Sequence, residues 1–75
     1  MIKDRRAALG ISQRDLAEKS GVKLRTIQHY ECGQRDINGA SLGTLVDLSL
    51  ALDCDICEIL TDSKLISKYE TMKKR

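Results

Sequence analysis

Apolar residues recur along the chain at the three- and four-residue spacing of amphipathic helices. In the segment 42–52, for example, Leu42, Leu45, Leu48 and Leu52 share one helix face. Glycines and N-cap residues such as Ser12 separate the apolar segments, as is typical of helix ends. The pattern therefore predicts an all-α chain, with helices over residues 2–9, 13–19, 23–32, 42–52, 55–60 and 63–72.

Residues 13–32 have the spacing of a helix-turn-helix. Gly21 can adopt the positive φ angle that ends the first helix abruptly. Two helices held at such an angle leave the outer face of the second free to enter a DNA major groove. The positions expected to pack the two helices together are Leu16, Ala17, Val22, Ile27 and Tyr30.

The charge of the chain is unevenly distributed, although its net value is only +2. Residues 1–35 carry eight Lys or Arg and four Asp or Glu, whereas residues 36–63 carry six acids and no Lys or Arg. Residues 64–75 are basic again, with five bases and one acid. The first basic part coincides with the helix-turn-helix, which favours a polyphosphate partner. An ordinary solvated surface with uneven charge is the alternative.

The composition fits one small helical domain. The chain has 75 residues, of which 41% are hydrophobic, and it contains no Phe, Trp or Pro. It has no signal peptide and no apolar run near the length of a membrane span, so we expect a cytoplasmic location and no membrane partner. With one His and no glycine-rich phosphate loop, we expect no enzyme, no cofactor and no small-molecule ligand.

The stretch from Ile2 to Leu60 resembles the lambda-repressor-like, Cro/C1-type helix-turn-helix family, also called the XRE family. The segments that carry the resemblance are IKDRRAALGISQRDLAEKSGV, TIQHYECG, SLGTLVDLSLAL and DICEIL. The resemblance implies a five-helix bundle that binds DNA, usually as a dimeric transcriptional regulator. We expect a helix-turn-helix DNA-binding domain over residues 1–62, followed by an extra C-terminal helix and basic tail over residues 63–75.

The exposed positions of the second helix of the motif are candidates for base contacts. Arg25 can form a bidentate bond with guanine, Gln28 can pair with adenine, and Leu24 can contact a thymine methyl group. The resemblance places Leu24, Arg25, and Gln28 or His29 where the family reads bases. Each of them could instead be an ordinary surface residue of the helix.

Phosphate contacts are expected around these base contacts. Gln13, at the start of the first helix of the motif, resembles the glutamine with which the family clamps a phosphate. A helix N-terminus suits that role because it offers unpaired N–H groups and a partial positive charge. The further candidates are Arg14, Lys23, Thr26, Arg35 and Asn38. We expect Arg6 to pair with Glu31 inside the fold rather than to bind DNA.

A surface for a second copy of the chain is also predicted. Val46 and Leu50 project away from the leucine face of residues 42–52, and Leu65, Ile66 and Tyr69 of the last helix extend that surface. Alternatively, the last helix folds back and covers Leu50 within one chain. Two functions follow: a dimeric repressor on a palindromic operator, or an antitoxin-like protein-interaction module whose DNA binding is secondary.

The three cysteines give only a weak signal for chemistry. Cys54 and Cys57 form a C-x-x-C pair, and Cys32 with His29 could complete a four-ligand zinc set. Burial as a small hydrophobic residue explains Cys54 equally well. We therefore expect no metal site, and a redox role for the cysteines stays open.

Overall fold

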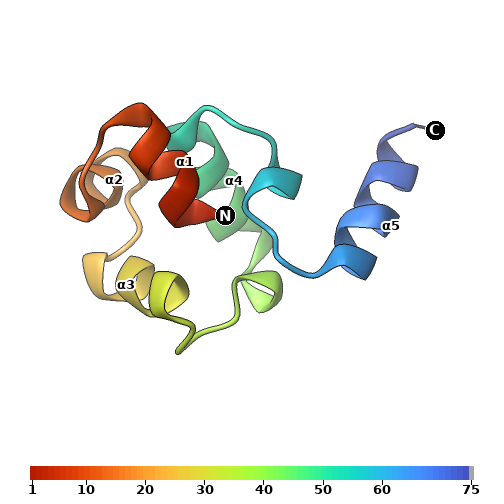
Figure 1. Ribbon diagram of the computed structural model, residues 1–75, viewed down its shortest axis with the longest axis horizontal. Coiled ribbons are helices and arrows are strands. Elements are labelled where there is room, and N and C mark those ends of the chain that lie inside the picture. Colours follow the sequence, from red (N-terminus) through yellow and green to blue (C-terminus); the bar gives the residue numbers. More distant parts are fainter. Residues whose placement is uncertain (75) are drawn as a thin grey trace.

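The computed structural model describes residues 1–74, which form five α-helices and two 3₁₀ turns (Figure 1). Arg75, in the predicted basic tail, lies outside the described residues. The predicted all-α class is confirmed. The elements in chain order are α1 (Ile2–Leu9), α2 (Gln13–Ser20), α3 (Leu24–Cys32), η1 (Ile37–Gly39), α4 (Leu42–Leu52), η2 (Ile56–Glu58) and α5 (Ser63–Lys73).

The ends of the helices are fixed by the residues that the sequence singled out. The Ser12 hydroxyl accepts a hydrogen bond from the Asp15 N–H at 3.0 Å, and the Asp15 carboxylate accepts one from the Ser12 N–H at 3.0 Å. This capping box starts α2 at Ser12, the N-cap that the sequence predicts. Ser41 starts α4 in the same way, since its hydroxyl accepts a hydrogen bond from the Thr44 N–H at 3.2 Å.

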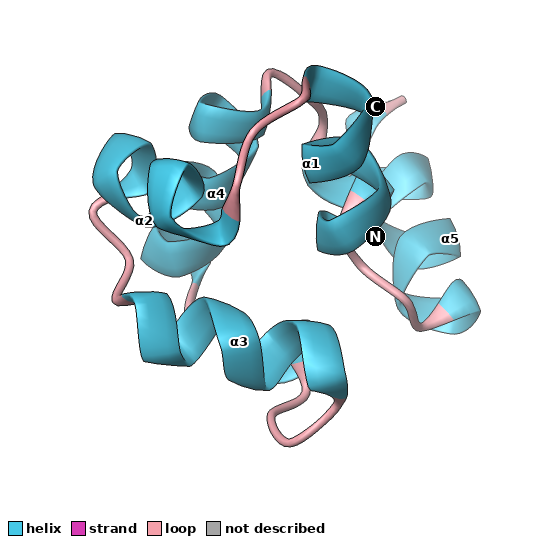
Figure 2. Cartoon of the chain, turned by 60° about the vertical axis from the view of Figure 1, so that its left-hand side comes forward, coloured by secondary structure: helices cyan, strands magenta, loops and turns pink. Residues whose placement is uncertain are grey.

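The core is aliphatic and is built around α4. Leu48 and Leu52 of this helix are completely buried, together with Leu16 of α2, Ile27 of α3 and Ile59 after η2. Helices α1, α2 and α4 lie together, and α3 lies below them in Figures 1 and 2. Because the Ile27 side chain projects from α3 into this core, the core itself sets the position of that helix.

Two local expectations need correction. Leu42, expected on the buried face of α4, is 70% exposed. It is the first residue of the helix, and side chains of a helix point back toward its N-terminus, so Leu42 projects beyond the edge of the core. The helix expected over residues 55–60 is a single 3₁₀ turn, η2, because so short a segment gains too few hydrogen bonds to offset helix nucleation.

The extra C-terminal helix α5 lies to one side of the bundle (Figure 1). Leu65 and Ile66 are partly buried against the core. Lys73, at the other end of α5, forms an ion pair with Asp55 at the start of η2. Contacts at both ends therefore hold α5 against the domain. No helix within residues 1–74 is long and apolar enough to cross a membrane.

Candidate nucleic-acid interface

Helices α2 and α3 form the predicted helix-turn-helix. Gly21 ends α2 with a φ of 75°, a conformation that side chains other than glycine rarely adopt. Its N–H donates to the Ala17 carbonyl at 2.9 Å. The next residue, Val22, is half-buried and packs against the core. The turn is thus short and fixed, and Leu16 and Ile27 lock the two helices together by complete burial on either side of it.

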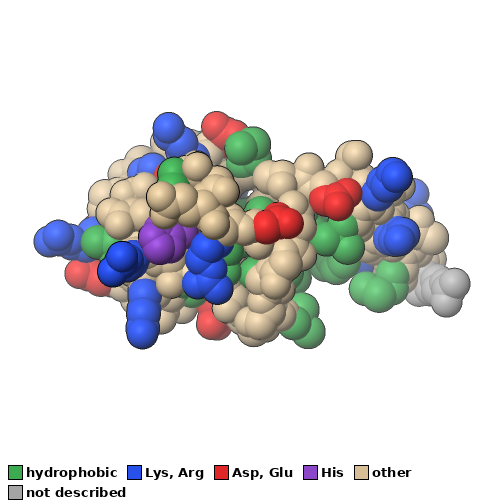
Figure 3. Space-filling model, turned by 90° about the horizontal axis from the view of Figure 1, so that it is seen from below, with side chains coloured by type: hydrophobic (Ala, Val, Ile, Leu, Met, Phe, Trp, Pro, Cys, Tyr) green, Lys and Arg blue, Asp and Glu red, His purple; other side chains and the backbone are tan. Residues whose placement is uncertain are grey.

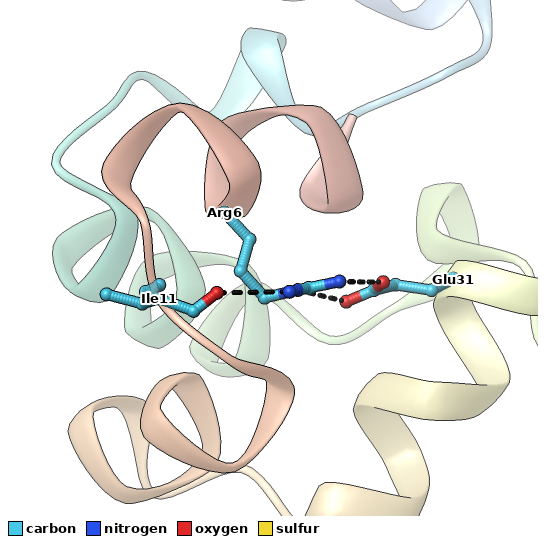
Figure 4. Close-up of polar contacts among 3 residues, drawn as sticks. All are labelled: Arg6, Ile11 and Glu31. Atoms are coloured by element: carbon cyan, nitrogen blue, oxygen red, sulfur yellow. Dashed lines mark hydrogen bonds and ion pairs between the residues drawn. The ribbon is translucent and has the colours of Figure 1, made fainter.

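An ion pair fixes the other end of α3 (Figure 4). The Arg6 guanidinium donates to both carboxylate oxygens of Glu31, with Nε–Oε2 at 3.0 Å and Nη2–Oε1 at 2.9 Å. Its third nitrogen, Nη1, donates to the Ile11 carbonyl at 3.0 Å. The hydrogen bond with Glu31 raises the pKa of Arg6. The predicted pairing is confirmed, and Arg6 joins α1, the loop before α2 and the last turn of α3.

The outer face of α3 carries the four residues expected to contact bases. Arg25 and Gln28 are exposed, whereas Leu24 and His29 are half-buried. Within residues 1–74, the side chains of Arg25 and Gln28 form no hydrogen bond or ion pair with the rest of the chain. Figure 3, which views the molecule from the α3 side, shows basic side chains and the chain's single histidine gathered over this helix. The face is therefore open, basic and rich in hydrogen-bond donors.

The residues expected to contact phosphates lie on α2, on α3 and its N-cap, and in the segment that follows α3. Gln13 is half-buried and Arg14 exposed at the N-terminus of α2, where the first N–H groups of the helix have no intrahelical acceptor. Lys23 is exposed and is the N-cap of α3, with no side-chain hydrogen bond closing that end. Thr26 is half-buried on α3 itself.

Arg35 and Asn38 follow α3 in the loop and in η1. The Arg35 guanidinium lies over the Tyr30 ring, and its Cζ atom is 5.5 Å from the ring centroid. This contact holds the exposed side chain of Arg35 close to α3. Asn38 has a different position. Its side-chain N–H₂ donates to Asp36 and Thr61 at 2.8 Å each, and its oxygen accepts from the N–H groups of Thr61 and Asp62. These bonds leave the amide of Asn38 no donor to offer a phosphate.

The surface predicted for a second copy lies between α4 and α5. Leu50 is 77% exposed and Val46 39% exposed, so α5 folds back onto the domain without covering Leu50. Tyr69 of α5 borders the same groove, which has a volume of about 310 Å³. Leu65 and Ile66, which were expected in this surface, instead contribute partly to the core of their own chain.

The cysteines do not converge on a site within residues 1–74. No group of three or more His, Cys, Asp or Glu side chains in this range is arranged to hold a metal ion. Cys54 is half-buried and packs against the core, whereas Cys32 is exposed. Burial raises the pKa of Cys54 and that of Cys57, so both thiols stay protonated at neutral pH.

Several polar contacts of the fold were not anticipated from the sequence, among them those of Arg5 and Asn38. The Arg5 guanidinium donates to the Leu52 and Asp53 carbonyls at 3.0 and 2.9 Å, and so satisfies the C-terminus of α4. Asn38 joins η1 to the segment before α5, as described above. Both contacts link residues more than twenty positions apart, and no local motif announces them.

The fold and the open face of α3 define a helix-turn-helix domain of the DNA-binding class. A family model described as helix-turn-helix matches residues 2–59. The chain therefore belongs to the Cro/C1-type helix-turn-helix family, the XRE family, whose members are DNA-binding regulatory domains. No curated protein and no solved structure matches the chain.

Proposed function

We propose that the protein is a sequence-specific transcriptional regulator that inserts α3 into the major groove of double-stranded DNA. The observation that carries the proposal is that the side chains of Arg25 and Gln28 are exposed and have no partner within residues 1–74. Both lie on the outer face of the second helix of the motif. A bidentate bond from Arg25 to guanine and one from Gln28 to adenine would read two bases, with Leu24 and His29 beside them.

Phosphate contacts would orient the domain on the duplex. Gln13 and Arg14 would bind a backbone phosphate at the N-terminus of α2, where the helix dipole favours an anion. Lys23, Thr26 and Arg35 would bind phosphates along α3. Asn38, whose amide is already fully hydrogen-bonded, would act by holding its loop in place. Contacts of this kind add affinity but no sequence information.

The protein would act as a homodimer and repress transcription by covering a promoter. A single domain of this size contacts few bases, so a palindromic operator read by two α3 helices, about 34 Å apart, supplies the missing specificity. Leu50 and Val46 support this part of the proposal because they are large, apolar and exposed beside an open groove. The protein would act without catalysis and in the cytoplasm.

In vitro selection from random duplex DNA tests the proposal. We expect one palindromic sequence to be enriched and to bind far more tightly than random duplex, with its half-site spacing reporting the dimer. A steep dependence of affinity on salt is not sufficient by itself, because non-specific binding shows it too. If no sequence is enriched, base reading by α3 is refuted.

One observation favours a second candidate function. The exposed Leu50 and the groove beside it also suit a protein partner, as an antitoxin-like interaction module would need. In that case a protein would co-purify with the chain at fixed stoichiometry, and the DNA binding would be weak and unselective.

A further inference from the structure

Helix α5 presents a polar, basic face on the side away from the core. Lys64, Ser67, Lys68 and Thr71 are all exposed, and with Met72 they line one open depression on the surface. Their spacing of three, four and seven residues places them on one side of the helix. The apolar residues that dock α5, Leu65 and Ile66, lie on another side.

The charge of this face is not neutralised within residues 1–74. Lys73 of the same helix pairs with Asp55, but Lys64 and Lys68 form no ion pair or hydrogen bond through their side chains in the described part of the chain. Like charges four residues apart destabilise a helix. No acidic residue lines the depression. Two ammonium groups and the Ser67 hydroxyl thus form a set of donors that suits an anion with several oxygens.

Basic side chains of both α3 and α5 are accessible from one side of the molecule. Figure 3 shows them over α3 at one end of this side and over α5 at the other, with acidic side chains between the two. The molecule is 36 Å along its longest axis, which runs horizontally in Figure 1. One turn of B-DNA is about 34 Å long. A duplex bound along this side would therefore meet both surfaces within one turn.

The two surfaces are held in a fixed relation. Asn38, just after the loop that follows α3, bonds to Thr61 and Asp62 immediately before α5. Asp36 and Asp62, the acidic residues of this connection, are used as caps: each carboxylate accepts hydrogen bonds from backbone N–H groups at the start of η1 or α5. These bonds orient both carboxylates toward the backbone of the chain.

From these observations we propose that Lys64, Ser67 and Lys68 of α5 form a second phosphate-binding site, which contacts the backbone of the same duplex that α3 reads. The proposal rests on the proposed function for the α3 contact and adds a phosphate contact outside the helix-turn-helix. It gives the basic C-terminal helix a role in affinity. The site carries no sequence information, since its ligands are phosphates alone.

The test compares the salt dependence of binding for the wild type, K64Q/K68Q and a control with the same loss of charge, K3Q/K19Q. Lys3 and Lys19 are exposed on α1 and α2. Each protein is titrated against a selected duplex with long flanks and against random duplex. Losing two phosphate contacts should reduce the slope of log K against log[salt] by about 1.8 and weaken binding up to about 60-fold at 0.1 M salt.

Three results support the proposal together: a shallower slope for K64Q/K68Q on both duplexes, an unchanged slope for K3Q/K19Q, and an unchanged preference for the selected site. Thermal melting checks that all three proteins fold alike. An unchanged slope for K64Q/K68Q, or an equal loss in the control, overturns the site. The site is also overturned if K64Q/K68Q keeps wild-type DNA binding and loses only its binding to phosphatidylserine vesicles, because the surface would then serve a membrane.

Failure of the two proposals can be told apart. If the wild type selects no sequence, base reading by α3 fails, yet the slopes on random duplex still test α5. If the wild type selects a sequence and K64Q/K68Q binds it with the wild-type slope, only the α5 site fails. Shortening the flanks of the selected duplex gives an independent check, since it should weaken the wild type and leave K64Q/K68Q unaffected.

Discussion

Replacing Arg6 by methionine removes three hydrogen bonds at once, two to Glu31 and one to the Ile11 carbonyl. The Glu31 side chain is only 5% exposed, so R6M leaves a carboxylate with little access to water. Breaking a buried pair costs about 3–5 kcal/mol. Because the Arg6 side chain keeps 17% exposure, we expect the lower end of that range, about 3 kcal/mol.

A loss of that size is large for so small a domain. At about 0.05–0.15 kcal/mol per residue, the whole chain has a free energy of unfolding of roughly 4–11 kcal/mol. Urea denaturation followed by circular dichroism measures the change. With a slope of about 1–3 kcal/mol per molar urea, the midpoint of unfolding should fall by roughly 1–3 M.

A double-mutant cycle separates the ion pair from simple loss of packing. E31Q keeps the shape of the side chain and removes its charge, and R6M/E31Q removes both charges. We expect the double variant to be no less stable than R6M alone, with a coupling energy of about 1.5–3 kcal/mol. If R6M costs less than about 0.5 kcal/mol, as a surface substitution does, or if the two costs simply add, the argument for a structural ion pair is refuted.

Three further predictions address the interface, the docking of α5 and the assembly. Arg25→Ala should cost about 1–3 kcal/mol on the selected duplex and relax the preference for one base, whereas equal loss on random duplex would make Arg25 a phosphate contact. The Lys73 ammonium lowers the pKa of Asp55 to about 2, so the carboxylate stabilises the fold above the unfolded-state pKa of about 3.9, and this contribution is lost as pH falls toward 2. Since both groups are partly exposed, we expect less than about 1 kcal/mol, measured as the difference between wild type and Asp55→Asn in urea titrations at pH 6 and pH 2.5. Leu50→Lys should convert a dimer to a monomer in sedimentation equilibrium while the helical circular dichroism of the folded chain stays unchanged, and a wild type that is monomeric at tens of micromolar would refute the α4 interface.

The features of the fold that are local in sequence were predictable from it. The capping box of Ser12 and Asp15 needs only two residues at a spacing of three, and the turn at Gly21 needs only one residue that tolerates positive φ. Arg6 and Glu31 lie 25 positions apart in the sequence, but their opposite charges stand on the first predicted helix and on the second helix of the predicted motif, which pack together in the bundle. For these elements, the residue types and their spacing are sufficient to predict the conformation.

The features that depend on where the core ends were not predictable. The spacing of Leu42 matches that of Leu45, yet only the three-dimensional arrangement shows that Leu42 lies beyond the edge of the core whereas Leu45 is buried. The bonds of Asn38 to Thr61 and Asp62 depend on how the chain returns past η1, which no short motif encodes. The loop position of Asn38 favours a phosphate contact, whereas the partners that occupy its amide lie more than twenty positions away in the sequence.

Contacts along the whole of α3 hold its outer face in place. Gly21 and the half-buried Val22 position the start of α3, Ile27 anchors its middle in the core, and the Arg6 pair holds Glu31 in its last turn. Ordering side chains costs about 0.5–1.5 kcal/mol for each long one that is immobilised, whereas ordering a backbone segment would add more per residue. DNA binding by this chain should thus lose little affinity to ordering of the helix, so that substitutions at Arg25 and Gln28 act through their own bonds to the duplex.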